Sequence, residues 1–267
     1  MKDLKSLTES VCHIAREAGA FLKEERKSFR REAVQVKHAH DYVSYVDKES
    51  EKRLVAALKE LLPEAGFITE EGSAVYQNEP YCWVVDPLDG TTNYIHDIAP
   101  YCVSIALRNK QELLLGVVYE PNRDECFYAW QGGGSYMNGE RIHVSPVTSI
   151  EEAFVVTELP YNTDQYARTG EHLIHELYGK VSGIRMNGSA ALALCYVAAG
   201  RFDAWLEAFI GKWDFSAAAL MVLEAGGNVT DFYGNDYFLE GHHIIATNGP
   251  LHPIFLNLVK EVPPLDM

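Results

Sequence analysis

The sequence predicts a mixed fold, α+β in its first half and α/β in its second, because the spacing of apolar residues changes along the chain. Apolar side chains recur every three or four residues over 4–22 and again after Asp47, which is typical of amphipathic helices. Short β-rich runs follow at 81–85, 101–107, 113–119 and 126–130. Turn signals such as Gly132-Gly133-Gly134 separate them, so we expect an antiparallel meander flanked by helices.

From about residue 150, predicted strands and helices alternate. The strands are expected at 154–157, 181–185 and 202–207, and the helices at 164–178, 189–199 and 215–225. This alternation is typical of α/β proteins. We therefore expect an N-terminal α+β half, residues 1–150, and a C-terminal α/β half, residues 151–267. Clefts between such halves are common ligand sites, so a site is expected in the seam.

Composition narrows the class of protein. The 267 residues carry 38 acidic and 23 basic side chains, a formal net charge of -15. This surplus repels nucleic-acid backbones and anionic lipids, so neither is an expected partner, although an anion could bind through a metal ion. The longest apolar run, 190–199, is far shorter than the roughly 20 residues of a membrane-spanning helix.

The expected location is the cytoplasm. The first ten residues, MKDLKSLTES, lack the apolar stretch of a signal peptide. The five cysteines are scattered and never form a Cys-x-x-Cys pair, which is typical of a reducing compartment. We interpret them as small core residues.

The strongest chemical signal is the octet Asp86-Pro87-Leu88-Asp89-Gly90-Thr91-Thr92-Asn93, which follows an apolar strand predicted to end at Val85. Asp86 and Asp89 can face one point and form a site for a hard cation. Gly90 lets the backbone approach an anion closely, and the threonines offer N–H and hydroxyl groups to a phosphate, particularly if a helix begins at Thr92. Alone, the pattern fits an ordinary turn equally well.

Further acidic residues have ordinary interpretations when each is considered by itself. Glu70-Glu71-Gly72 is typical of a solvated turn, and both Asp214 and Asp47 could cap the helices that they precede. A zinc site at His172 and His175 is disfavoured because no third ligand is evident, and His242 and His243 would point to opposite faces of a strand.

Taken together, these segments resemble the inositol monophosphatase family of magnesium-dependent, lithium-sensitive phosphatases. The similarity covers nearly the whole chain in order, through DYVSYVD (41–47), Glu70-Glu71, DPLDGTTNY (86–94), Gly183-Ile184-Arg185 with Gly188-Ser189-Ala190-Ala191, and WDFSAAALMVLEAGG (213–227). The resemblance implies a layered αβαβα sandwich, commonly a homodimer, with the active site between its halves.

By position, the resemblance also implies the ligands of two or three Mg²⁺ ions, which Mn²⁺ could replace. Glu70, Asp86 and the Leu88 carbonyl would bind one ion, and Asp86, Asp89 and Asp214 would bind a second. Glu70 would help to hold a third ion through water.

The remaining implied roles are catalytic and substrate-binding. Asp47 and Thr91 would orient the attacking water, and Glu71 would support the metal ligands without binding a metal ion itself. Gly90, Thr91 and Thr92 would hold the phosphate. The pocket for the polyol would be formed by Glu207, Gly188, Ser189 and Ala190.

The function implied is a Mg²⁺-dependent phosphomonoesterase acting on a small phosphorylated polyol or sugar, with inositol 1-phosphate as the first expectation. Fructose-1,6-bisphosphate, NADP(H) and histidinol phosphate remain alternatives, because relatives share the metal core. Thr92-Asn93 stands where phosphatases of 3'-phosphoadenosine 5'-phosphate carry Lys-Glu, which disfavours that substrate. A regulatory interaction protein is the alternative from another class.

Overall fold

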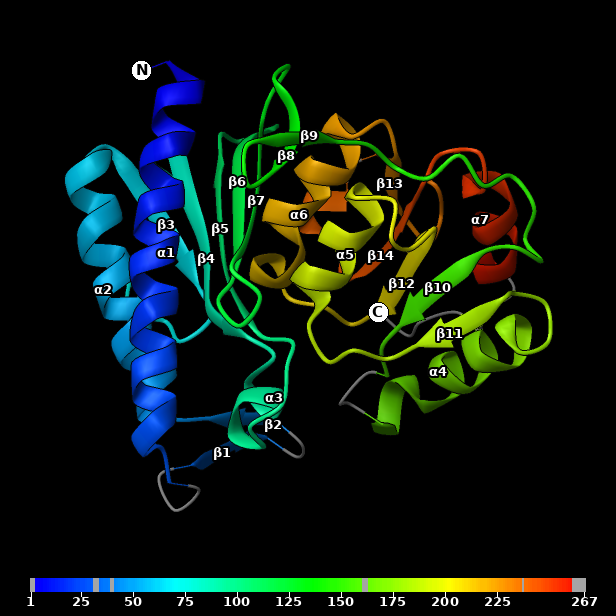
Figure 1. Ribbon diagram of the computed structural model, residues 1–267, viewed down its shortest axis with the longest axis horizontal. Helices are drawn as coiled ribbons and strands as arrows, with labels where there is room; N and C mark the ends of the chain where they lie inside the picture. Colours follow the sequence, from blue (N-terminus) through cyan, green and yellow to red (C-terminus); the bar gives the residue numbers. More distant parts are fainter. Residues whose placement is uncertain (1–2, 31–33, 39–40, 160–162, 237, 261–267) are drawn as a thin grey trace.

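The computed structural model describes residues 3–30, 34–38, 41–159, 163–236 and 238–260, and these form alternating layers of helix and sheet (Figure 1). Helices α1 (Leu4–Ser28) and α2 (Tyr45–Leu61) cover one face of a first sheet. Helices α5 (Ala190–Ala198) and α6 (Lys212–Glu224) lie between this sheet and a second. Helices α4 (Thr163–Leu177) and α7 (His252–Lys260) form the outer layer. The expected αβαβα sandwich is confirmed.

The first sheet has seven strands in the order β3-β4-β5-β6-β7-β8-β9. They are β3 (Ala65–Thr69), β4 (Tyr81–Asp89), β5 (Cys102–Arg108), β6 (Leu113–Glu120), β7 (Glu125–Trp130), β8 (Gly134–Met137) and β9 (Glu140–Ile142). β3 is parallel to β4, and every other pair is antiparallel. The predicted meander is confirmed, and β8 and β9 extend it beyond the glycine turn.

The second sheet has five strands in the order β11-β10-β12-β14-β13. They are β10 (Phe154–Thr157), β11 (Gly183–Arg185), β12 (Ala204–Ala208), β13 (Asn228–Asp231) and β14 (His243–Thr247). β10, β11 and β12 are parallel, as α/β alternation predicts, but β14 is antiparallel to both its neighbours. β13 was not predicted, because three of its four residues are polar. A further pair is formed by β1 (Gln35–His38) and β2 (Asp41–Val43).

The second helix begins before Asp47, so the expectation that Asp47 precedes it is wrong. The N-cap is Ser44, whose hydroxyl accepts the N–H of Val46 at 3.1 Å. The Asp47 carboxylate in turn accepts the Ser44 N–H at 2.9 Å, which completes a capping box. The cap therefore holds one oxygen of Asp47 and leaves the other directed elsewhere.

Three buried apolar clusters lie between the layers. The largest surrounds α5 and α6, whose alanine-rich surfaces are buried on all sides because a sheet lies on each side of the pair.

Four cysteines are buried and Cys12 is partly buried, all as free thiols, which confirms them as core residues. No helix in the described segments is long and apolar enough to cross a bilayer. The division at residue 150 stays a prediction, since α5 and α6 pack on the sheet formed earlier in the chain.

Close packing of α6 against β6 depends on Gly116. A Cβ atom at this position would lie 2.3 Å from the backbone oxygen of Ala217. We therefore predict that Gly116→Ala lowers the free energy of unfolding by about 1–3 kcal/mol through overpacking. Urea denaturation measures this change. Gly241→Ala is the control, because its nearest obstacle is 3.3 Å away; equal losses in the two variants would contradict the packing argument.

Candidate metal and phosphate site

Three carboxylates from distant parts of the sequence meet at the carboxyl end of β4. Oxygens of Asp86, Asp89 and Asp214 all lie within 4.8 Å of one another. Asp86 and Asp89 are both on β4, which continues to Asp89 rather than ending at Val85 as predicted. Residues three apart on a regular strand point to opposite faces, but the register shifts between Asp86, opposite Ser104, and Asp89, opposite Cys102. This bulge lets both carboxylates face the same space.

Asp86 and Asp89 are buried, which makes their negative charges costly. Burial raises the pKa of Asp86 well above its usual value, and the nearby charges of Glu70, Asp89 and Asp214 raise it further. Burial also raises the pKa of Asp89. The local hydrogen bonds only partly offset these effects: the N–H of Leu88 donates to Asp86 at 2.9 Å, and the hydroxyl of Ser189 donates to Asp89 at 2.6 Å.

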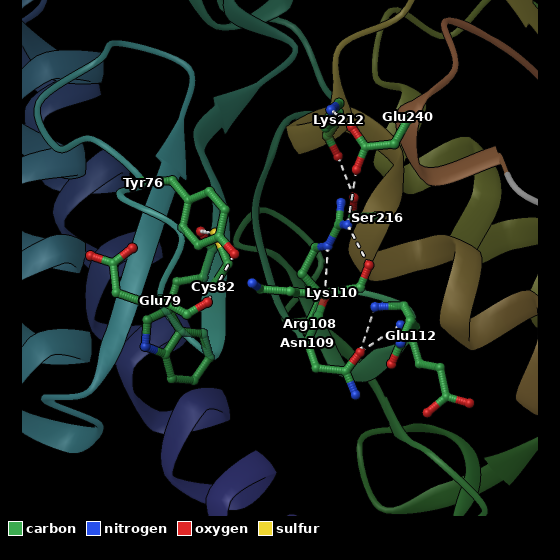
Figure 2. A network of polar contacts seen from close by, with 12 residues as sticks. Tyr76, Glu79, Cys82, Arg108, Asn109, Lys110, Glu112, Lys212, Ser216 and Glu240 are labelled. Carbon is green, nitrogen blue, oxygen red and sulfur yellow. Dashed lines mark hydrogen bonds and ion pairs between the residues drawn. The ribbon is translucent and has the colours of Figure 1, made fainter.

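Asp214 lies in the first turn of α6 but is not its N-cap. Gly211 is the N-cap, and its N–H donates to the Asp214 carboxylate at 2.9 Å. The start of α6 is held by Glu240, in the 3₁₀ helix η2 (Phe238–Glu240), which forms ion pairs with Lys212 and with the buried Arg108. Figure 2 shows these three side chains converging beside Ser216. This network fixes the helix turn that carries Asp214.

Thr91 and Asp47 are brought together as expected. The Thr91 hydroxyl lies 3.0 Å from the second carboxylate oxygen of Asp47 and 3.0 Å from the Leu88 carbonyl. Asp47 is fully buried, and burial raises the pKa of its carboxyl group. Because both neighbours of the Thr91 hydroxyl are acceptors, its proton points toward them and a lone pair remains for another donor.

The backbone between β4 and α3 (Thr91–Ile95) requires glycine. Gly90 has φ 89° and caps α3, which begins at Thr91, one residue before the suggested start. A Cβ here would lie 2.9 Å from the Pro100 carbonyl oxygen and 3.1 Å from that of Gly188. Asn93 joins the same two segments, because its amide donates at 2.8 Å to the carbonyls of Pro100 and Asn187. No role had been predicted for Asn93.

Glu51 is a second residue that sequence reasoning missed. It is fully buried, and its carboxylate accepts the N–H of Glu71 at 2.7 Å and that of Ser73 at 2.8 Å. These bonds hold the turn that presents Glu70. The available signal was its spacing: Glu51 lies four residues after Asp47 on a helix, so the two share one face. For Glu71, the contact that supports the turn is made by its backbone.

A cavity of about 360 Å³ joins these parts. The predicted residues that line it are Glu70, Asp86, Leu88, Asp89, Gly90, Thr91, Thr92, Gly188, Ser189, Ala190, Glu207 and Asp214. Burial raises the pKa of Glu207 well above its usual value, and its Oε2 has no hydrogen-bond partner among the described residues. Asp47 contacts this space through Thr91.

Glu158, also missed, lines the same cavity just after β10. Its carboxylate accepts the N–H groups of Asn187 at 2.7 Å and Gly188 at 2.9 Å. Burial nevertheless raises its pKa from 4.5 to about 6. His242 and His243 contact different partners: the ring of His242 lies 3.1 Å from the Ile210 carbonyl, while Nδ1 of His243 accepts the N–H of Phe209.

Comparison with known proteins places the chain in a family. The model of the inositol monophosphatase family matches residues 3–263. "Nus factor SuhB" of Pseudomonas aeruginosa is 42% identical over 87% of this chain and 88% of the relative. "Inositol monophosphatase 2" of Solanum lycopersicum is 37% identical over 97% of this chain and 99% of the relative. The chain belongs to the inositol monophosphatase family, a family of metal-dependent phosphatases.

Solved structures support the same assignment. The extragenic suppressor protein SuhB from Bartonella henselae superimposes with a TM-score of 0.89 at 35% identity, covering 96% of this chain and 99% of that one. The family resemblance and the expected phosphatase class are therefore confirmed. The individual roles of the site residues stay predictions.

The raised carboxyl pKa values predict how stability depends on pH without metal ions. A carboxyl group whose pKa is raised by folding favours the folded state below its unfolded pKa, and this contribution is lost as the pH rises through the folded pKa. For Glu158 the loss falls between pH 4.5 and about 6. Its substitution Glu158→Gln should flatten this part of a melting-temperature profile measured in chelator. Parallel wild-type and variant profiles would contradict the role of burial.

Proposed function

We propose that this protein is a Mg²⁺-dependent phosphomonoesterase whose first substrate is inositol 1-phosphate. The observation that carries the proposal is the convergence of Asp86, Asp89 and Asp214 beside the glycine-threonine turn in one cavity. Phosphomonoester hydrolysis has one of the highest barriers that enzymes overcome. A single acid or base accelerates a reaction by only about 10²- to 10⁴-fold. A carboxylate cluster that holds divalent cations beside the phosphate would meet that demand.

The donor set fits hard divalent cations. Its members offer only oxygen, from carboxylates and the Leu88 carbonyl, and this set favours Mg²⁺ or Mn²⁺ over zinc. The carboxylates of the buried Asp86 and Asp89 and the half-buried Asp214 lie so close together that a cation is needed to stabilise their ionised forms. Glu70, Asp86 and Leu88 would hold one ion, and Asp86, Asp89 and Asp214 another. When bound, such ions lower the pKa of water and offset charge on the phosphate and the leaving alkoxide.

Thr91 and Asp47 orient the attacking water. The Thr91 hydroxyl donates its hydrogen bond to Asp47 and the Leu88 carbonyl, so a lone pair of the Thr91 oxygen can accept a hydrogen bond from water at the edge of the cavity. That bond directs a water lone pair toward the phosphate held at Gly90, Thr91 and Thr92. Positioning of this kind supplies a large share of the rate in phosphoryl transfer.

Glu207 recognises the leaving alcohol. Its Oε2 is buried without a hydrogen-bond partner in the part of the chain that the structure describes, which is costly unless a ligand supplies a donor. A polyol hydroxyl provides that donor. Gly188, Ser189 and Ala190 form the adjoining wall of the cavity. The site is therefore suited to a phosphate on an alcohol that carries a neighbouring hydroxyl group.

We predict that Asp86→Asn lowers kcat/KM for inositol 1-phosphate at least about 100-fold, because an amide no longer balances cation charge at the centre of the cluster. The same change removes a buried negative charge, so the variant should melt at a higher temperature than the wild type in chelator. Asp97→Asn is the control, since Asp97 is exposed and asparagine tolerates its φ of 60°. An Asp86→Asn enzyme with wild-type turnover would refute the proposal.

Phosphate release should require Mg²⁺, recover with Mn²⁺ and fall with millimolar lithium, as the family resemblance implies. The measurement is a phosphate-release assay after removal of metal ions and stepwise addition of each cation. At a pH above 7, where the ionised carboxylates of the cluster repel one another most strongly, added Mg²⁺ should also raise the melting temperature. Full activity in excess chelator would contradict the proposal.

A regulatory role is the second candidate, favoured by the relative named Nus factor SuhB. The two functions are separated by isolating the Asp86→Asn protein from cells and analysing bound polymerase and RNA. Retention of such partners by the inactive variant would support a role independent of hydrolysis. We also propose that the protein is a homodimer, which the family resemblance supports. We propose the cytoplasm as its location, which the free cysteines support.

A further inference from the structure

Three large apolar side chains surround the mouth of the catalytic cavity. Leu159, Met186 and Phe209 line it, yet their exposed fractions are 49%, 51% and 45%. Each follows one of the parallel strands β10, β11 and β12. The three parallel strands lie side by side in the second sheet (Figure 1) and end at one edge of it, which brings these residues to one cavity although they are distant in sequence. We call them the apolar rim.

Phe209 is held in the rim by an unusual backbone conformation. Its φ is 63°, whereas the other non-glycine residues with positive φ in the described segments are all Asn or Asp. A bulky side chain is strongly disfavoured in this region, and such strain is concentrated at functional sites. Burial does not account for the strain here, because nearly half of the side chain is exposed.

Neighbouring histidines stabilise this conformation. The Phe209 N–H donates to Nδ1 of His243 at 3.1 Å, and its ring centroid lies 6.2 Å from that of His242. Burial lowers the pKa of His243 to about 4, so at neutral pH its ring is uncharged and has a nitrogen that accepts this bond. The result is a fixed aromatic surface at the entrance to a site that is otherwise acidic and polar.

We propose that the apolar rim is a specificity site that binds an aromatic group attached to the alcohol of the phosphomonoester. The inference deepens the proposed phosphatase function and rests on it. The apolar rim and the carboxylate cluster line one continuous cavity, so a substrate whose phosphate lies at the carboxylates extends to the rim. The cavity volume of about 360 Å³ is within the range of pockets for drug-sized ligands. In addition to polyol phosphates, the rim would favour phosphate esters that bear an aromatic ring a few bonds from the scissile oxygen.

The rim would act on binding, since the ring of the substrate is in contact before and during the reaction. Aromatic pairs contribute beyond the area that they bury and prefer offset or edge-to-face arrangements, which an exposed and fixed Phe209 ring permits. Contacts that are equal in the ground state and the transition state change KM and leave kcat nearly constant. A change in KM at nearly constant kcat therefore distinguishes a specificity site from a general structural effect.

The test compares 2-phenylethyl phosphate with ethyl phosphate, because both leave as primary alkoxides and differ by the ring. Wild-type kcat/KM should be about 10-fold higher for 2-phenylethyl phosphate than for ethyl phosphate. Phe209→Gly should reduce this ratio of kcat/KM values by about 3- to 10-fold, mainly through KM. Rates on ethyl phosphate should stay within about twofold. Glycine accepts the positive φ, so the variant should fold at least as stably as the wild type.

Two further variants complete the test. Phe209→Leu should retain part of the preference, and Tyr178→Ala, which removes an aromatic side chain 81% exposed and outside the cavity, should retain all of it. A wild-type ratio near one, or a ratio unchanged in Phe209→Gly, overturns the inference, as does phosphate release from inositol 1-phosphate alone. Failure to release phosphate from any of the three esters would instead overturn the proposed function.

Discussion

Repulsion between three clustered carboxylates, two of them buried, is the constraint on which the architecture of the site depends. Asp86, Asp89 and Asp214 would separate or protonate if the chain were free to adjust. A bulge in β4 and the capped first turn of α6 hold them together. The fold therefore retains an arrangement that is unfavourable without a cation and becomes favourable with one, which links its stability directly to its proposed chemistry.

The five layers provide the rigidity that this arrangement needs. β4 is an inner strand of the first sheet, and α6 is packed between both sheets, so neither carrier of the cluster can move independently. Glu51, Asn93 and Glu240 lie behind the cavity and hold, respectively, the Glu70 turn, the Gly90 turn and the start of α6. Their contacts position groups carried by the first sheet and by the middle layer of helices.

Sequence reasoning predicted the elements whose signals are local and the ligands that lie in compact motifs. Asp86 and Asp89 were found because they are adjacent to an apolar strand, and α1 because its apolar stripe is regular. It failed where tertiary pairing decides: β13 is short and polar, and the β4 bulge follows from pairing with β5. Glu158 was missed because a lone glutamate has no distinctive pattern until the fold supplies its partners, whereas Glu51 was missed although its spacing of four residues from Asp47 placed both on one helix face.

The central claim is that these carboxylates form a cage for divalent cations. The most direct measurement is a crystal structure grown with Mn²⁺, with anomalous scattering used to locate the ions. The account predicts at least two peaks, each within about 2.5 Å of carboxylate oxygens, with Asp86 shared between them. A well-ordered site with no peak beside Asp86, Asp89 and Asp214 at saturating Mn²⁺ would contradict it.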